Sequence, residues 1–143
     1  MGVTNFDEYR DVFVVADTID DVVHPVTYEL IGQARRIAKE LGQLVQVMLL
    51  GENVQSEAEE LVAHGADIVH VFESPLLKYY TTDGYTKVLT DFFEDHKLNI
   101  LLIGATNNGR DLAPRMSGRM KNGVVADCTI LTVDTTEGLV EWT

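Results

Sequence analysis

Five short runs of apolar, mostly β-branched residues alternate along this chain with longer segments of helical periodicity, and this alternation is the feature that most constrains its fold. The apolar runs predict buried strands at residues 12–16, 44–50, 68–72, 100–103 and 129–133. Strands joined by helices of about 10–16 residues need right-handed crossovers, which make the strands parallel and put helices on both faces of the sheet. The sequence therefore predicts an α/β fold with a doubly wound, mostly parallel, five-stranded sheet.

The first two helices are predicted from apolar residues that recur every three or four positions. The first begins at Val26, continues to Leu41 and stops at Gly42, where a left-handed residue commonly ends a helix. The second carries Ser56 with Glu59 three residues later, which is the spacing of a capping box. We therefore expect the second helix to open at this pair of residues.

The other two helices follow the third and fourth strands. The third is predicted to begin with Thr82 as its N-cap and to run through Phe93 along one apolar stripe. In the fourth, Pro114 helps to place the start, because proline is tolerated in a first turn but costs about 3 kcal/mol deeper in a helix. Asp111 or a near neighbour is therefore expected to cap that helix.

The balance of charge limits the classes of partner. The 143 residues contain 23 acidic and 11 basic side chains, for a formal net charge of -12, which argues against binding to nucleic acid phosphates. No apolar stretch approaches the roughly 18 residues of a membrane span. With Cys128 as its one cysteine and no signal or transit peptide pattern at the start, the chain is expected to be cytoplasmic.

Ligands of such sheets meet the carboxyl ends of the strands, so the loops that follow the strands are the candidate sites. The loop at residues 104–111 is the most unusual, since it combines glycines, asparagines and an Arg-Asp pair at the mouth of a helix. Its candidate residues are Asn107, Asn108, Gly109, Arg110, Asp111 and, nearby, Arg115. Free backbone N–H groups and the helix dipole there favour an anionic group such as a phosphate. In the competing interpretation these residues form turns, cap the helix and pair with a neighbouring subunit.

Three tyrosines gather around the loop that follows the third predicted strand: Tyr79, Tyr80 and Tyr85. Aromatic side chains of this kind either form a surface for a protein partner or anchor the loop to the core. The sequence leaves both roles open.

Familiar catalytic and cofactor motifs do not occur in the sequence. There is no G-x-G-x-x-G after the first strand and no phosphate-binding loop with Lys followed by Ser or Thr. The four histidines are scattered, namely His24, His64, His70 and His96, so no metal site is predicted. His64 and His96 are expected near helix ends and His70 within a strand. Cys128 and Ser117 lack the surroundings of a nucleophile. No catalytic residue is expected.

The run from Gly104 through Arg115, Gly-Ala-Thr-Asn-Asn-Gly-Arg-Asp-Leu-Ala-Pro-Arg, resembles a segment of the alpha subunit of electron-transfer flavoproteins. The resemblance continues to Gly123 and through residues 126–129, Ala-Asp-Cys-Thr. Upstream it includes residues 64–67, His-Gly-Ala-Asp, and Pro75-Leu76. It therefore covers essentially the whole chain.

This resemblance implies a heterodimeric electron carrier that is not itself an enzyme. Such a carrier takes electrons from dehydrogenases, for example acyl-CoA dehydrogenases, through FAD to an acceptor. The N-terminal domain of the alpha subunit has an adenine-nucleotide alpha-hydrolase-like fold and packs against the beta subunit. In members that carry out flavin-based electron bifurcation, a second FAD lies in the beta subunit near this boundary, which the segment from Asn107 to Arg115 is expected to face.

The resemblance also implies a division of the chain. Residues 1–134 are expected to form the N-terminal α/β domain, and residues 135–143 to begin the connection to an FAD-binding domain that is absent from this sequence. No tightly bound flavin is then expected on this piece, whose role would be docking to the beta subunit. The alternative is a free-standing module that binds AMP, ATP or FAD at residues 104–111. A small hydrolase is disfavoured, because no nucleophile and base are paired.

Overall fold

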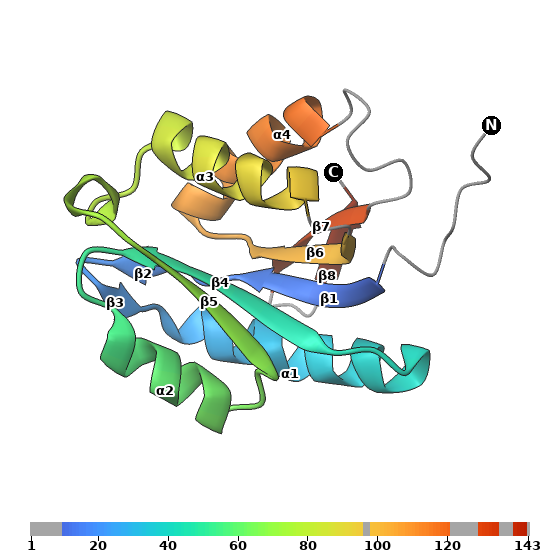
Figure 1. Ribbon diagram of the computed structural model, residues 1–143. Helices are drawn as coiled ribbons and strands as arrows, with labels where there is room; N and C mark the ends of the chain where they lie inside the picture. Colours follow the sequence, from blue (N-terminus) through green and yellow to red (C-terminus); the bar gives the residue numbers. More distant parts are fainter. Residues whose placement is uncertain (1–9, 96–97, 121–128, 135–138, 143) are drawn as a thin grey trace.

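The computed structural model describes residues 10–95, 98–120, 129–134 and 139–142 (Figure 1). Its helices are α1 (Pro25–Leu41), α2 (Gln55–Ala63), α3 (Thr82–Asp95), α4 (Asn107–Met120) and the short 3₁₀-helix η2 (Pro75–Leu77). Its strands are β1 (Arg10–Val15), β2 (Thr18–Ile19), β3 (Val22–Val23), β4 (Val45–Gly51), β5 (Ile68–Glu73), β6 (Leu98–Gly104), β7 (Thr129–Asp134) and β8 (Leu139–Trp142). Within these residues, none of the helices has the length and hydrophobicity that crossing a membrane requires.

Strand β1 lies inside the main sheet, paired in parallel with β4 on one side and with β6 on the other. The complete order is β5-β4-β1-β6-β7-β8, and every neighbouring pair is parallel except β7 and β8. The predicted doubly wound sheet of five parallel strands is confirmed. Strand β8 adds a sixth, antiparallel strand over residues that were expected to begin a connection. A separate two-stranded hairpin, β2–β3, follows β1.

Helices cover both faces of the sheet, with α1 and α2 below and α3 and α4 above in Figure 1. Two apolar cores result, and successive residues of β1 contribute to each in turn. Val12 and Val14 pack on the α1 side, whereas Phe13 and Val15 pack on the side of α3 and α4. The continuous apolar run of β1 follows from this arrangement, because neither face of a doubly covered strand meets water.

The first helix has the boundaries that its sequence predicts within one residue. Its N-cap is His24, whose Nδ1 accepts a hydrogen bond from the Val26 N–H at 3.0 Å. Its C-cap is Gly42 in the left-handed conformation, with φ at +66°. A backbone N–H in the first turn of a helix has no carbonyl partner within the helix. The His24 ring accepts from such an N–H here, as the side chain of Ser or Asp does in most helices.

The predicted capping box of the second helix is wrong. Helix α2 begins at Gln55, so Ser56 lies inside its first turn, and Val54 at the N-cap position provides no side-chain cap. The Glu73 carboxylate at the end of β5 accepts instead from the Val54 N–H and from the Gln55 side-chain amide, each at 3.0 Å. A long-range partner therefore fixes this helix start.

The expected N-cap of the third helix is displaced by one residue. The hydroxyl of Thr81 accepts from the Gly84 N–H at 3.3 Å, so Thr81 occupies the cap and Thr82 is the first helical residue. Because Thr81 and Thr82 are adjacent and both can cap a helix, the local sequence does not show which of them is the N-cap. The hydroxyl of Thr82 is engaged elsewhere, with the carboxylate of Asp111.

The expected cap of the fourth helix is also wrong. Helix α4 begins at Asn107, and the Thr106 hydroxyl accepts from the Gly109 N–H at 3.1 Å. Asp111 therefore lies in the second turn, and Pro114 lies inside the helix. Proline there forfeits one backbone hydrogen bond. The buried residues Leu112 and Met116 anchor this helix to the sheet despite that loss.

Candidate functional site

The carboxyl ends of β1 and β6 lie side by side where the strand order reverses. Asp17 lies two residues beyond β1, and Thr106 lies two residues beyond β6. The Thr106 hydroxyl donates a hydrogen bond to the Asp17 carboxylate and accepts one from the backbone of Gly109. One side chain thus joins the two central strands at this switch point and caps α4.

The first turn of α4 approaches β6 so closely that it admits no side chain at Gly109. A Cβ added there would lie 1.8 Å from the carbonyl oxygen of Gly104. On the other side of the strand, a Cβ added at Gly104 would lie 3.3 Å from Cγ1 of Val26 on α1. The two glycines therefore allow helix, strand and helix to stack with little space between them.

A small hollow of about 20 Å³ remains at this switch point. Asp17, Thr18, Tyr80, Tyr85 and Asn108 supply its polar lining. The hydroxyls of Thr18 and Tyr85 point to backbone carbonyls of neighbouring segments, at 3.1 and 3.0 Å. The hollow has room for about one water molecule, far less than the several hundred Å³ that a nucleotide-sized ligand needs.

Two of the candidate residues on α4 are exposed at the helix mouth. Asn107 is exposed, and Arg110 is exposed with its Nε donating to the carbonyl oxygen of Ala105 at 3.2 Å. Asn108 is half-buried in the lining of the hollow. Neither asparagine side chain has a hydrogen-bond partner within the described part of the chain. These amides remain available to an external group.

Asp111 is directed toward α3. Its carboxylate accepts hydrogen bonds from the hydroxyls of Thr82 and Tyr80, and these bonds hold the pKa of Asp111 below its usual range. Burial, followed by the bond to Asp111, raises the pKa of Tyr80 well above that of an ordinary tyrosine. The Tyr80 ring also packs edge-on against Tyr85, with centroids 5.0 Å apart. Asp111 therefore joins α4 to the start of α3.

Arg115 is likewise engaged with α3, because its guanidinium forms an ion pair with Asp83. Both side chains are largely exposed, so the pair contributes little to stability by itself. The six candidate residues therefore do not form one site. Asn108 and Gly109 border the hollow, Asn107 and Arg110 lie at the exposed helix mouth, and Asp111 and Arg115 contact α3.

Comparison with known proteins decides the family. Residues 12–143 match the electron transfer flavoprotein domain. The chain belongs to this family. It is 44% identical over 136 residues to the electron transfer flavoprotein subunit alpha of Megasphaera elsdenii, covering 95% of this chain and 40% of that relative. These findings confirm the resemblance found in residues 104–115.

Two further relatives have more specific names. The lactate dehydrogenase (NAD(+),ferredoxin) subunit LctC of Acetobacterium woodii is 44% identical over 133 residues, which is 93% of this chain and 32% of that relative. The acryloyl-CoA reductase electron transfer subunit beta of Anaerotignum propionicum is 42% identical over 130 residues, or 91% of this chain and 35% of that relative. This electron transfer flavoprotein domain thus spans two fifths or less of the length of these relatives.

The flavin that the family name implies does not fit the switch point of this electron transfer flavoprotein domain. The hollow of about 20 Å³ is bordered by Tyr85 and by Gly109, where α4 approaches Gly104 of β6 closely. An isoalloxazine or adenine ring would have to displace the Tyr85 side chain and to separate α4 from β6 at Gly109. The residues described at the carboxyl edge therefore do not form a flavin pocket.

Some residues that organise this edge were not predicted from the sequence. Thr106 is the N-cap of α4 and the partner of Asp17, although a threonine directly before a helical segment is itself a capping signal. Asp17 directly follows the apolar run at residues 12–16, so the sequence places it at the carboxyl end of the first strand, where the sites of such sheets lie. Thr18 and Tyr85 could not have been paired from the sequence, because 67 positions separate them.

The three histidines that the structure describes in this electron transfer flavoprotein domain, His24, His64 and His70, have structural partners. The Nε2 of His70 lies 2.6 Å from Oε1 of Gln46, and the ring of His64 lies 4.2 Å from that of Tyr28. In the described ranges, no group of three His, Cys, Asp or Glu side chains could hold a metal ion. His96 and Cys128 lie outside the described residues, so their predicted roles stay predictions.

Proposed function

We propose that this domain corresponds to the N-terminal part of an electron transfer flavoprotein alpha subunit and serves mainly to dock a beta subunit. The parent heterodimer would carry electrons from dehydrogenases, such as acyl-CoA dehydrogenases, through FAD to an acceptor. The observation that carries the proposal is the match of residues 12–143 to this family, together with 44% identity to an alpha subunit. The name of LctC, with NAD(+) and ferredoxin in it, favours a parent of the bifurcating kind.

The closed switch point supports docking over chemistry on this domain. The polar side chains of Asp17 and Thr106 bond to one another, and the hollow beside them has room for about one water. Flavin binding is accordingly assigned to a further domain of the parent protein, whereas Leu139–Trp142, expected to begin the connection to it, form strand β8 of this domain's own sheet. Under this proposal the domain alone is colourless, since the parent's flavin is held elsewhere.

The exposed mouth of α4 is the part of the candidate site that we assign to the subunit boundary. Asn107 and Arg110 are exposed there, next to the positive end of the α4 dipole. Asn108, Gly109, Asp111 and Arg115 would support this surface from behind, by closing the switch point and holding α4 against α3. An anionic group of the beta subunit or of its flavin would suit this surface.

The direct test is to purify this chain with a beta subunit of the same organism and to measure their affinity by calorimetry. We expect a one-to-one complex and roughly tenfold weaker binding for the Asn107→Ala, Arg110→Ala double variant, as for loss of a polar anchor at an interface. Arg119→Ala, which changes an exposed residue at the other end of α4, is the matched control. Absence of any complex would refute the docking role.

The same preparation tests the nucleotide-binding alternative. Titration of the chain alone with AMP, ATP and FAD at millimolar concentrations is expected to release no heat of binding. Saturable binding that Arg110→Ala abolishes would replace docking by a nucleotide-binding function. A bound flavin on the purified chain, seen as absorbance near that of oxidised FAD, would also contradict the proposal.

A further inference from the structure

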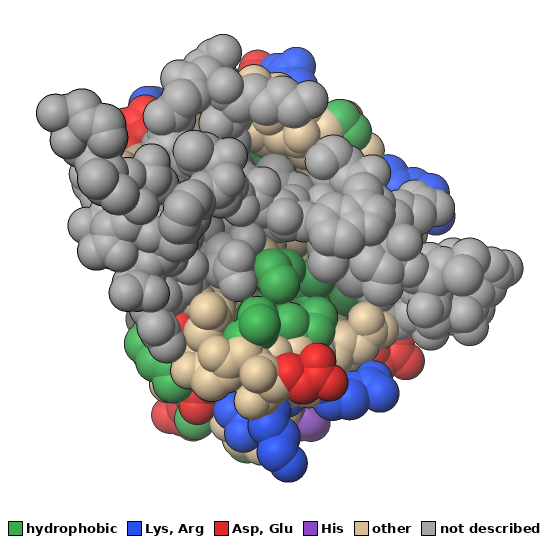
Figure 2. Space-filling view, turned by 90° about the vertical axis from the view of Figure 1, so that its right-hand side faces the viewer, with side chains coloured by type: hydrophobic (Ala, Val, Ile, Leu, Met, Phe, Trp, Pro, Cys, Tyr) green, Lys and Arg blue, Asp and Glu red, His purple; other side chains and the backbone are tan. Residues whose placement is uncertain are grey.

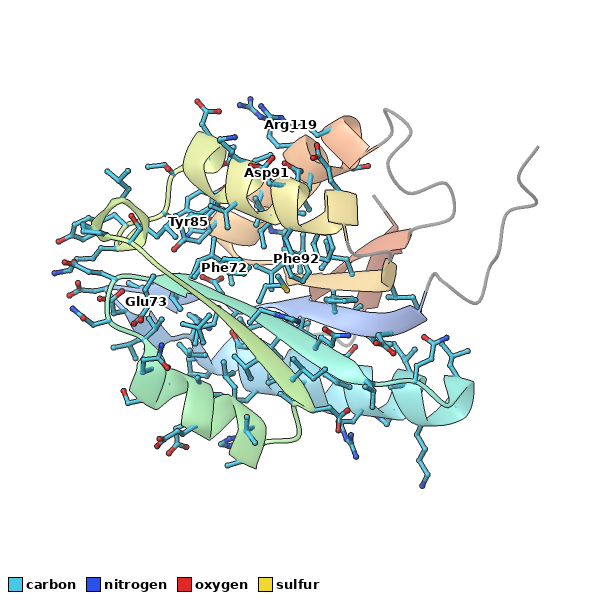
Figure 3. The ribbon with its side chains drawn as sticks, in the orientation of Figure 1. Phe72, Glu73, Tyr85, Asp91, Phe92 and Arg119 are labelled. Atoms are coloured by element: carbon cyan, nitrogen blue, oxygen red, sulfur yellow. The ribbon has the colours of Figure 1, made fainter. Side chains whose placement is uncertain are left out.

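Two buried hydroxyl groups meet in the wall of the hollow at the switch point. Thr18 is 5% exposed and Tyr85 is 3% exposed, and both residues line the hollow. Their hydroxyl oxygens lie 3.4 Å apart. Figure 3 shows the Tyr85 side chain between α3, which carries it, and the sheet. The contact therefore joins the β2–β3 hairpin to α3 across the carboxyl edge of the sheet.

The protons of these two hydroxyls are already used. The Thr18 hydroxyl donates to the carbonyl oxygen of Leu50 at 3.1 Å. The Tyr85 hydroxyl donates to the carbonyl oxygen of Leu77 at 3.0 Å. A hydroxyl has one proton to donate and can also accept, so no proton is left for the contact between the two oxygens. Both oxygens therefore present lone pairs at a buried position, where acceptors normally have a donor.

The start of α4 brings hydrogen-bond donors to the same hollow. Asn108 lines it and is half-buried. The Thr106 hydroxyl and carbonyl accept from the N–H groups of Gly109 and Arg110, which satisfies two of the four donors in the first turn of α4. Within the described part of the chain, neither the backbone N–H of Asn108 nor its side-chain amide has an acceptor. The lining thus combines buried acceptors with a residue that can donate.

The charges around the hollow do not suit an ion. A cation would lie at the positive end of the α4 dipole, and the Asp17 carboxylate already accepts from Thr106. An anion would lie beside Asp17, and the described residues of the lining include neither Lys nor Arg. Lys and Arg side chains gather instead over the end of α1, at the bottom of Figure 2. A small neutral molecule that both donates and accepts hydrogen bonds fits these groups.

We propose that the hollow is a site for one ordered water molecule, which donates to the hydroxyl oxygens of Thr18 and Tyr85 and accepts from Asn108. The volume of about 20 Å³ is that of about one water, and a bound water needs two to four polar partners. The three residues provide them. The water joins the hairpin, α3 and α4, next to the direct hydrogen bond between Asp17 and Thr106. The site is complete without a partner chain, because every group that forms it belongs to this domain.

High-resolution crystal structures of this chain test the site directly. We expect a single density peak within hydrogen-bonding distance of both hydroxyl oxygens and of an Asn108 nitrogen, at roughly 2.6–3.2 Å from each. A second crystal soaked in rubidium chloride identifies the occupant. Rubidium anomalous signal at the peak would overturn the proposal, because the site would then bind a cation. A hollow without density, or one filled by the Asn108 side chain itself, would overturn it as well.

A double-mutant cycle tests the bridge in solution. Thr18→Val and Asn108→Ala should each lower the melting temperature, by roughly 2–6 °C. No hydrogen bond joins these two residues directly in the described structure, so a bridging molecule is needed to couple them. The double variant should therefore lose less than the sum of the single losses. Additive losses would overturn the bridge between the hairpin and α4.

Matched variants separate the bridge from general damage to the fold. Thr18→Val combined with Asn107→Ala should be additive, because Asn107 is exposed at the helix mouth and is not in the lining of the hollow. Tyr85→Phe should remove the density peak, whereas Tyr79→Phe, which changes an exposed side chain, should leave it. A peak that persists unchanged in Tyr85→Phe would show that the Tyr85 hydroxyl does not hold the water, which contradicts the proposed site.

Discussion

The hydroxyl oxygen of Tyr80 lies 2.7 Å from Oδ2 of Asp111 and donates a hydrogen bond to it. The two residues are 31 positions apart and belong to segments on either side of β6. Their bond, with that from Thr82, fixes how the entry to α3 sits against α4. Since Asn107 and Arg110 are carried by the same helix, the position of the proposed docking surface depends on this contact.

The Tyr80–Asp111 bond should contribute to stability and vary with pH in the acid range. The folded-state pKa of Asp111 is lowered from an ordinary value of 3.8, so its contribution is present above that value and is lost as pH falls through the lowered pKa. Asp111→Asn should therefore destabilise the chain at pH 7 and make less difference near pH 3. Denaturant unfolding of both proteins at the two pH values measures this, and an equal difference at both would contradict it.

Tyr80→Phe removes the hydroxyl that donates the same hydrogen bond to Asp111. Loss of one such hydrogen bond should lower the free energy of unfolding by about 0.5–1.5 kcal/mol. The double variant with Asp111→Asn should lose less than the sum of the two single losses, because both changes remove one interaction. Additive losses in this double-mutant cycle would show that Tyr80 and Asp111 act independently.

Stability should also decline in alkali. Burial raises the pKa of Tyr85, and the pKa values of Tyr28 and Tyr80 are raised as well. Above pH 10 the unfolded chain ionises these phenols while the folded chain keeps them neutral, so unfolding becomes more favourable as pH rises. Urea unfolding between pH 8 and pH 11 is expected to show this loss, and Tyr85→Phe should have a shallower pH dependence than the wild type.

Gly109→Ala should be severely destabilising. The new methyl group would overlap the carbonyl oxygen of Gly104, which forces α4 away from β6 at an expected cost of about 3 kcal/mol or more. Gly118→Ala is the control in the same helix, because nothing lies within 4 Å of its added Cβ. It should stabilise by up to about 1 kcal/mol through higher helix propensity. Thermal unfolding of both variants measures the contrast, and similar melting temperatures would refute the close contact.

Thr106→Val should lower the free energy of unfolding, because the Thr106 hydroxyl both caps α4 and joins the ends of β1 and β6. It removes the acceptor for the Gly109 N–H and the donor to Asp17, with an expected cost of about 1–2 kcal/mol. Thr106→Ser keeps the hydroxyl and should retain most of the stability. If valine and serine were equally stable there, the hydroxyl would have no role in holding the switch point.

The confirmed sequence predictions are those that rest on local patterns. The apolar run in β1 required a strand covered on both faces, and Gly42 required a left-handed end to α1. The wrong ones concern helix starts. Ser56 and Glu59 have the spacing of a capping box, but the Glu73 carboxylate, 19 positions from Val54, fixes that start instead. Proline at position 114 suggested a late start for α4, whereas tertiary burial carried the helix across it.

By itself, the sequence determined the alternation of the five parallel strands with the four main helices, the family and the absence of familiar nucleotide motifs, because each depends on residue type and spacing along the chain. Only the tertiary structure decided which candidate residues meet. It turned Asp111 and Arg115 toward α3, closed the switch point through Asp17 and Thr106, and brought the hairpin beside η2. The physical reason is that these contacts join residues dozens of positions apart, and their geometry exists only once the sheet has set the register of its strands.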